Sequence, residues 1–205
     1  WIKWLTFSKS TAMKDNIIQQ IQASIDTKQA ILHNSELLDN IEIVARKLIE
    51  TYQHNGKILI AGNGGSAADA QHMAAELVGR FELERKGLPA IALTTDSSIL
   101  TAVGNDYGYH YTFARQVEAL GNPKDCFIAI STSGNSESIV NAVKTAKNQG
   151  LYCIGLTGFK PCTMDSLCDI MLKVPSTHTP RIQESHLLIE HILCQIIESE
   201  IFSTH

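Results

Sequence analysis

Five apolar runs of strand length, separated by stretches with helical periodicity, dominate the chain from residue 57 onward. They cover residues 57–61, 89–93, 126–130, 152–156 and 170–174. Each run is almost continuously apolar, as expected of strands that are covered on both faces. Strands that alternate with helices are typical of a parallel, doubly wound sheet. The sequence therefore predicts an α/β fold with five parallel strands.

Residues 13–55 have a different character, because they contain no glycine and read as two helices that separate near residues 33–35. In the second helix an apolar stripe follows a cap at Ser35, and it comprises Leu38, Ile41, Ile43, Ala45 and Leu48. We expect these helices to extend a domain formed by residues 56–205, as one structural unit. Met13 reads like a natural start, so residues 1–12 are expected to be a tag or an extension without a functional role.

The last helical pattern, residues 180–202, carries isoleucines and leucines on more than one face. A helix on the surface of a monomer needs only one apolar face. We therefore expect part of this helix to pack against another subunit.

The composition excludes several classes of function. The 205 residues are 44% hydrophobic and 19% charged, as in an ordinary globular protein, and the net charge is −4. Because no basic cluster is longer than two residues, we expect no binding to nucleic acid. No apolar run approaches the roughly 20 residues of a membrane span, so we expect no membrane insertion. The five cysteines form no CxxC pair, which favours a reducing, cytoplasmic setting over disulfides or a cysteine zinc site.

A turn rich in hydroxyl groups follows the third apolar run. Ser131, Thr132, Ser133 and Ser136 surround Gly134, which can adopt a positive φ angle. A helical pattern follows at once, and the N-terminus of a helix offers unpaired N–H groups and a partial positive charge. One serine would suffice to cap that helix. Four hydroxyl groups favour a phosphate site instead.

A second turn, Gly62-Asn63-Gly64-Gly65-Ser66, follows the first apolar run. In an open parallel sheet, both turns lie at the carboxyl ends of the strands, where ligands bind. Glycines let a backbone approach a ligand closely, although they are also common in tight turns. The segment matches neither the phosphate loop of nucleotide hydrolases nor the dinucleotide-binding pattern, so we expect no nucleotide.

Two helices carry polar side chains that can hold a metal ion or move protons. His72 and Glu76 are one turn apart and therefore share a helix face, although such a pair is often only a solvated contact. In the last helix His191 lies among apolar residues, where a core or interface histidine is the usual explanation. Gln183 and His191 are separated by about 12 Å along a helix. One ion between them needs converging side chains or different subunits.

The remaining polar cluster is Gly104-Asn105-Asp106, which precedes a run of tyrosines. Asparagine and aspartate after a glycine are typical of a turn. Alone, this segment indicates little about function.

Together these segments resemble the sugar-isomerase (SIS) domain family, and within it the bacterial phosphoheptose isomerases. The matching segments are 62–66, 69–72, 75–77, 104–106, 130–136, 156–158 and 181–184, with His191. They extend over nearly the whole chain from about residue 15. The serine-rich turn alone indicates a SIS domain, whereas its combination with His72, Glu76, Gln183 and His191 is narrower.

The resemblance implies a three-layer αβα sandwich, a homotetramer with active sites near subunit interfaces, and one zinc ion per subunit. It implies a phosphate cradle made of Ser131, Thr132, Ser133 and Ser136. Further substrate contacts are implied for Asn63, Gly64, Gly65, Ser66, Glu76, Asn105, Asp106 and Gln183. The implied zinc ligands are His72, Glu76, Gln183 and His191. One departure is Pro180, where the family often has aspartate; a proline suits the first turn of a helix.

The implied reaction converts sedoheptulose 7-phosphate to D-glycero-D-manno-heptose 7-phosphate through an enediol, for the synthesis of lipopolysaccharide or capsule. Such an isomerisation needs a base, an acid and stabilisation of a developing oxyanion. We expect Glu76 to be the base and His191 the acid, with the phosphate held at a distance from the reacting carbons. A carboxylate bound to zinc is a poorer base. The metal therefore either polarises the carbonyl while Glu76 moves off it, or is mainly structural.

Two other functions remain open. One is a SIS protein without catalytic activity that binds a phosphosugar or a replication-initiation partner; such a protein needs neither Glu76 nor His191, which favours the enzyme. The other is an isomerase for a different phosphosugar, such as arabinose 5-phosphate.

Overall fold

The computed structural model describes residues 2–202, and the side chains from residue 12 onward. Residues 1 and 203–205, which belong to the predicted extension and domain, lie outside the described residues. The helices are α1 (Ile2–Leu32), α2 (Ser35–Gln53), α3 (Gly65–Val78), α4 (Ser97–Tyr107), α5 (Thr112–Leu120), α6 (Glu137–Asn148) and α7 (Thr179–Phe202), with the short 3₁₀ helices η1 (Tyr109–Tyr111) and η2 (Thr163–Ser166). The strands are β1 (Ile58–Gly62), β2 (Ala90–Ala92), β3 (Cys126–Ile130), β4 (Tyr152–Gly158) and β5 (Ile170–Val174). All five predicted strands are confirmed.

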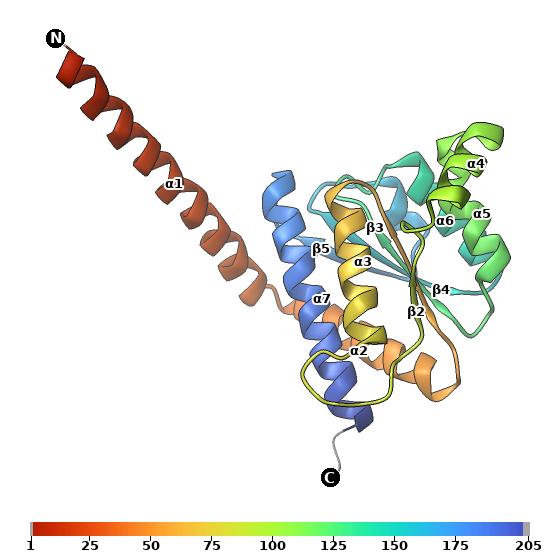
Figure 1. Cartoon of the computed structure of the whole chain (residues 1–205). Coiled ribbons are helices and arrows are strands. Elements are labelled where there is room, and N and C mark those ends of the chain that lie inside the picture. Colours follow the sequence, from red (N-terminus) through yellow and green to blue (C-terminus); the bar gives the residue numbers. More distant parts are fainter. Residues whose placement is uncertain (1, 203–205) are drawn as a thin grey trace.

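The strands form one parallel sheet in the order β2-β1-β3-β4-β5 (Figure 1). In the register, Ile58 pairs with Ala90 on one side and with Cys126 on the other. The chain thus moves from β1 to β2 in one direction and then returns to place β3 on the other side of β1. The carboxyl ends of β1 and β3 therefore form the switch point, where doubly wound sheets bind ligands.

Helices cover both faces of the sheet, which confirms the three-layer αβα sandwich. Helices α2, α3 and α7 lie on one face, and α4, α5 and α6 lie on the other (Figure 1). Successive side chains of a strand point to opposite faces. Accordingly, Ile58 and Ile60 belong to the core beneath the first group, and Leu59 and Ala61 to the core beneath the second.

Helix α2 shows where the predicted apolar stripe was wrong. The side chain of Asn34, rather than Ser35, caps the helix by accepting a hydrogen bond from the backbone N–H of Leu37 at 3.1 Å. Leu38 and Ile43 were predicted to be buried, but they are 41% and 48% exposed. Ile43 follows the buried Ile41 by two residues, which turns it about 200° around the helix axis. The buried face instead comprises Leu37, Ile41, Val44, Ala45 and Leu48, with Thr51.

Helices α1 and α7, the two longest, differ in how far the rest of the chain packs against them. Helix α1 runs unbroken from Ile2 to Leu32 and projects away from the sandwich, so residues 2–12 continue the predicted first helix (Figure 1). Helix α7 begins at Thr179, which places Pro180 in its first turn. It buries apolar side chains against α2, α3 and the sheet of its own chain. The expected contact of α7 with another subunit stays a prediction. Among residues 2–202, no helix combines the length and the hydropathy that crossing a membrane requires.

Candidate active site

The serine-rich turn connects β3 to α6 at the switch point. Gly134 adopts a φ angle of +65°, and the hydroxyl of Ser131 donates to that of Ser136 at 3.1 Å. The hydroxyl of Ser133 lies 3.5 Å from that of Ser131. Ser136 occupies the N-cap position of α6, yet its side chain makes no capping hydrogen bond. Three hydroxyl groups thus face one another at a helix N-terminus, an arrangement that suits an anion.

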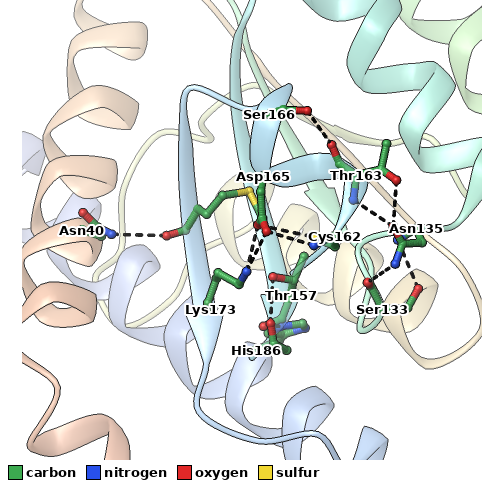
Figure 2. A network of polar contacts seen from close by, with 12 residues as sticks. Asn40, Ser133, Asn135, Thr157, Cys162, Thr163, Asp165, Ser166, Lys173 and His186 are labelled. Atoms are coloured by element: carbon green, nitrogen blue, oxygen red, sulfur yellow. Dashed lines mark hydrogen bonds and ion pairs between the residues drawn. The ribbon is translucent and has the colours of Figure 1, made fainter. Parts of the chain in front are cut away.

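The segment 162–166 supports this turn from behind, as Figure 2 shows. The side-chain oxygen of Asn135 accepts hydrogen bonds from the backbone N–H and the hydroxyl of Thr163, both at 2.8 Å. Its amide nitrogen donates to the carbonyl oxygen of Ser133 at 3.0 Å. A Cβ atom at Gly134 would collide with Cys162, and its positive φ angle also disfavours other residues. The turn therefore has little freedom to change shape.

The same supporting segment contains a carboxylate with a lowered pKa. Burial alone would raise the pKa of Asp165, but hydrogen bonds from Lys173 and from the backbone of Cys162 hold it below its ordinary value. Both oxygens of Asp165 lie 2.9 Å from the Lys173 ammonium (Figure 2). This ion pair ties η2, behind the phosphate turn, to strand β5.

A cavity of about 200 Å³ opens beside the phosphate turn. Thr132, Ser133 and Asn135 form one wall, and Lys160 and Thr179 lie on the others. Of the predicted phosphate ligands, Thr132 and Ser133 line this cavity. A phosphate in this cavity would meet the hydroxyl groups of Thr132 and Ser133 and the ammonium group of Lys160.

The glycine-rich turn after β1 lies next to the phosphate turn, because Gly62 and Ile130 are paired across the sheet. The side chain of Asn63 donates to the hydroxyl of Ser138 at 3.1 Å and accepts a hydrogen bond from the hydroxyl of Tyr109 at 2.7 Å. Gly64 has a φ angle of +57° with open space around it. The turn therefore presents a fixed amide and bare backbone to the switch point.

The predicted substrate residues Gly65 and Ser66 begin helix α3. A Cβ atom at Gly65 would lie 2.5 Å from the amide nitrogen of Gln183, so the Gln183 side chain packs on the bare backbone there. The Ser66 side chain is buried. The structure thus joins the first turn of α3 to the first turns of α7.

Residues 104–106, whose sequence is also typical of a turn, lie within helix α4. Asp96 supplies the cap that lets this helix form: its side chain accepts a hydrogen bond from the backbone N–H of Ile99. The side chains of Asn105 and Asp106 are exposed and hydrogen-bond to each other at 2.8 Å.

Three of the predicted metal-binding and catalytic residues meet between α3 and α7. The Nε2 atoms of His72 and His191 are 2.8 Å apart, and His72 Nε2 lies 3.3 Å from the Glu76 carboxylate. Ligand atoms of all three lie within 4.8 Å of one another. The ring of Phe81 packs against His191, with centroids 5.6 Å apart. The spacing of one helical turn between His72 and Glu76 thus produces a shared site with the last helix.

Gln183 does not join this cluster within one chain, since its side chain lies against Gly65. By the rise of an α-helix, His72 is about 10 Å and Glu76 about 16 Å along α3 from Gly65. The cluster therefore lies below the carboxyl edge of the sheet, whereas the phosphate turn lies on that edge. Within one chain, His72, Glu76 and His191 are therefore separated from the phosphate turn.

Two further carboxylates lie near the cluster, and sequence reasoning missed both. Burial, together with the nearby charge of Asp69, raises the pKa of Glu190 to about 9. Burial also raises the pKa of Asp69, to about 6. Both oxygens of Glu190 and one of Asp69 are buried without a hydrogen-bond partner in the described residues. A glutamate among apolar residues of the last helix was the only available signal.

The core histidine that the sequence suggested is His186 rather than His191. His186 is fully buried, and its Nε2 atom lies 3.2 Å from the carbonyl oxygen of Thr157 (Figure 2). Burial lowers its pKa to about 4, so its imidazole is neutral at physiological pH. His191, by contrast, faces the polar cluster.

Comparisons with known proteins agree with this architecture. A family model described as SIS domain matches residues 21–158. The phosphoheptose isomerase of Aneurinibacillus thermoaerophilus is 57% identical over 190 residues, which cover 93% of this chain and 96% of that protein. The structure of the phosphoheptose isomerase from Neisseria gonorrhoeae has a TM-score of 0.86 at 41% identity, covering 91% of this chain and 99% of that chain. The corresponding structure from Francisella tularensis has a TM-score of 0.87 at 41% identity, covering 90% and 97%.

The family model includes both turns and helix α3, and each of these relatives covers at least 90% of the chain. Relatives at this level of identity carry the name of an isomerase, which does not favour the alternative of a SIS protein without catalytic activity. The chain therefore belongs to the phosphoheptose isomerase family of SIS-domain proteins and is an enzyme of the aldose–ketose isomerase class.

Proposed function

We propose that this enzyme converts sedoheptulose 7-phosphate to D-glycero-D-manno-heptose 7-phosphate, a precursor of cell-surface polysaccharide. The observation that carries the proposal is the meeting of His72, Glu76 and His191 in a chain that also has a phosphate turn. A phosphate turn alone supports binding of any sugar phosphate. The names of the relatives supply the seven-carbon sugar.

The phosphate turn is the proposed anchor for the end of the sugar that does not react. The hydroxyl groups of Ser131, Ser133 and Ser136, with Thr132, would surround the phosphate at the N-terminus of α6. Binding energy gained there holds the rest of the sugar in a productive position. The fixed amide of Asn63 and the bare backbone at Gly64 and Gly65 would border the sugar itself.

The proposed proton transfers use the His72 cluster. Glu76 would take a proton from the carbon next to the carbonyl, and His191 would deliver a proton on the way through the enediol. The Nε2 atom of His72 lies 2.8 Å from that of His191, so His72 can hold the second imidazole in place. Substrate-binding roles of Asn105, Asp106, Ser66 and Gln183 stay part of the proposal.

The donor set of the cluster fits a zinc ion. Two imidazole nitrogens and a carboxylate are ligands that zinc prefers, and here they lie within 4.8 Å of one another. We propose one zinc ion per subunit, with His72, Glu76 and His191 of one chain as ligands. Because Gln183 packs against Gly65 in the same chain, a fourth ligand, Gln183, would come from a neighbouring subunit. When bound, zinc would supply a Lewis acid that polarises the substrate carbonyl.

A cytoplasmic location is part of the proposal. All five cysteines are free in the structure. Burial raises the pKa of Cys126 to about 11 and that of Cys153 to about 12, so these two are neutral thiols at physiological pH. Neutral, unpaired thiols suit a reducing compartment.

We propose a homotetramer, and helix α1 supports an assembly of several copies. Met13, Ile17, Ile21 and Ile25 recur every four residues along α1, and each is at least 45% exposed. An exposed apolar row on a projecting helix needs a covering partner. The separation of the phosphate turn from the His72 cluster in one chain fits sites completed by a neighbouring subunit.

The oligomeric state is testable with substitutions in this row. We expect light scattering to give the mass of four chains for the native protein. The double substitution Ile17→Glu and Ile21→Glu places two charges in the covered row and should reduce the mass. Gln19→Glu adds a charge to an exposed polar position of the same helix and should not. A native protein that is monomeric at micromolar concentration would contradict the proposal.

The activity is testable with three substrates. We expect the purified protein to isomerise sedoheptulose 7-phosphate at least tenfold faster, by kcat/KM, than ribulose 5-phosphate or fructose 6-phosphate. Treatment with a chelator should lower the rate, and added zinc should restore it if the metal takes part. A preference for one of the shorter sugars would contradict the proposed substrate, and chelation without effect would contradict a catalytic zinc ion.

A further inference from the structure

A buried ion pair lies at the end of α3, close to the His72 cluster. The side chains of Arg85 and Glu198 are both 2% exposed, and Arg85 Nε lies 2.7 Å from the Glu198 carboxylate. Arg85 belongs to the loop after α3, and Glu198 to helix α7. In Figure 1 this loop passes beside the C-terminal part of α7.

The carboxylate of Glu198 holds the loop to α7. It accepts hydrogen bonds from the backbone N–H groups of Phe81 at 3.0 Å and of Glu82 and Leu83 at 2.6 Å each. Burial alone would raise the pKa of Glu198, but these three N–H groups and Arg85 lower it to about 2. The carboxylate is therefore charged throughout the physiological range.

The guanidinium of Arg85 holds the loop to α3. Its Nη2 atom donates to the carbonyl oxygen of Glu76, and its Nη1 atom donates to that of Leu77, both at 2.8 Å. The last carbonyl groups of a helix have no partner within the helix, so this side chain satisfies two of them. The backbone of Glu76 is thus fixed by a direct contact.

We propose that Arg85 and Glu198 are positioning residues, which hold Glu76 and His191 at the distance that the proton transfers need. Three contacts lead from the pair to the cluster: Arg85 to the Glu76 backbone, Glu198 to the Phe81 backbone, and the Phe81 ring to the His191 ring. Glu198 also lies two turns after His191 on the same helix. The ion pair therefore sets the position of α3 relative to α7 where the two reactive side chains face each other. This inference rests on the proposed isomerase activity.

The test uses two conservative variants and a matched control. Arg85→Lys keeps the charge but loses the planar fork that reaches two carbonyl groups. Glu198→Gln keeps the shape but loses the charge. The control is Asp125→Asn at the amino edge of the sheet: Asp125 is also buried, pairs with Lys57 and accepts N–H groups from Lys57 and Asn122. It resembles the Arg85–Glu198 pair in chemistry but is remote from the cluster.

We expect Arg85→Lys and Glu198→Gln to lower kcat 10- to 100-fold at temperatures where they are folded, with KM changed less than threefold, because small displacements of reacting groups cost rate rather than binding. Asp125→Asn should lower the melting temperature but leave kcat within twofold. If all three variants lose stability and keep kcat, the pair is only structural and the inference is wrong.

A second readout separates this inference from the proposed activity. In metal-free protein, the imidazole NMR signals of His72 and His191 should shift in Arg85→Lys and Glu198→Gln, and should stay in Asp125→Asn. Signals that stay in all three would overturn the positioning role even if the enzyme is active. If the native protein has no isomerase activity but the signals still shift in Arg85→Lys and Glu198→Gln, the positioning role would be supported and the proposed function contradicted.

Discussion

Replacing Glu76 by glutamine is expected to lower kcat for sedoheptulose 7-phosphate about a thousandfold, with KM changed little. General-base catalysis contributes about 10²- to 10⁴-fold to a rate. The amide of glutamine has nearly the same shape as the carboxylate, but it cannot take a proton. Glu76 is only partly buried, and its side chain contacts His72, so the fold should tolerate the change.

The measurement must separate the base from the proposed metal ligand. If the loss of activity in Glu76→Gln came only from weaker zinc binding, excess zinc would restore the rate, and we expect no such rescue. Glu42→Gln provides a control, because Glu42 is an exposed glutamate of α2 that pairs with Arg46. It should keep full activity. Isomerase activity retained in Glu76→Gln would exclude Glu76 as the base.

The sequence predicted the sheet well because parallel strands covered on both faces are continuously apolar. The runs at β1 and β3 could be recognised from composition alone, and the helices between them implied the doubly wound order. Helix α2 was less predictable. Its apolar residues include Leu38 and Ile43, which the chain leaves exposed, so the apolar pattern did not identify a single buried face.

The candidate site was predictable where it depends on local sequence. The four hydroxyl residues before α6 lie within positions 131–136, and His72 and Glu76 are one helical turn apart. Both patterns can therefore be recognised in a short stretch of sequence. The Arg85–Glu198 pair joins residues 113 positions apart, so no local sequence pattern predicts this contact. The same holds for Tyr109, whose hydroxyl reaches Asn63 across the switch point. The position of Gln183 against Gly65 depends on how α3 and α7 pack, which helical periodicity does not specify.

The second large effect is expected on protein stability, when Glu190 is replaced by glutamine. The pKa of Glu190 is about 9 in the folded protein against an ordinary value of 4.5, because it is fully buried and lies near Asp69. Folding at neutral pH therefore requires the uptake of a proton. At about 1.4 kcal/mol per pKa unit, this requirement costs about 3 kcal/mol at pH 7.

Glu190→Gln is expected to remove this cost and raise the free energy of unfolding by as much as about 3 kcal/mol at pH 7. Because the folded pKa of Glu190 lies above the unfolded one, the contribution of this group to stability is fully present below about pH 4.5 and is lost as the pH rises toward 9. The gain of the variant should therefore vanish near pH 4 and increase up to pH 9. The raised pKa of Asp69 acts in the same direction up to about pH 6 in both proteins.

Denaturant unfolding of the metal-free protein at pH 5, 7 and 9 measures this dependence. Removing the metal matters because Glu190 is next to His191. Glu200→Gln is the matched control, since Glu200 is an exposed residue of the same helix and should show no gain at any pH. A Glu190→Gln variant that is no more stable than the native protein at pH 9 would mean that Glu190 is ionised in the fold, with a cation or ordered water near its two oxygens. A gain that increases with pH would instead identify Glu190 as a neutral acid packed between α3 and α7, whose cost to the stability of the protein grows as the pH rises.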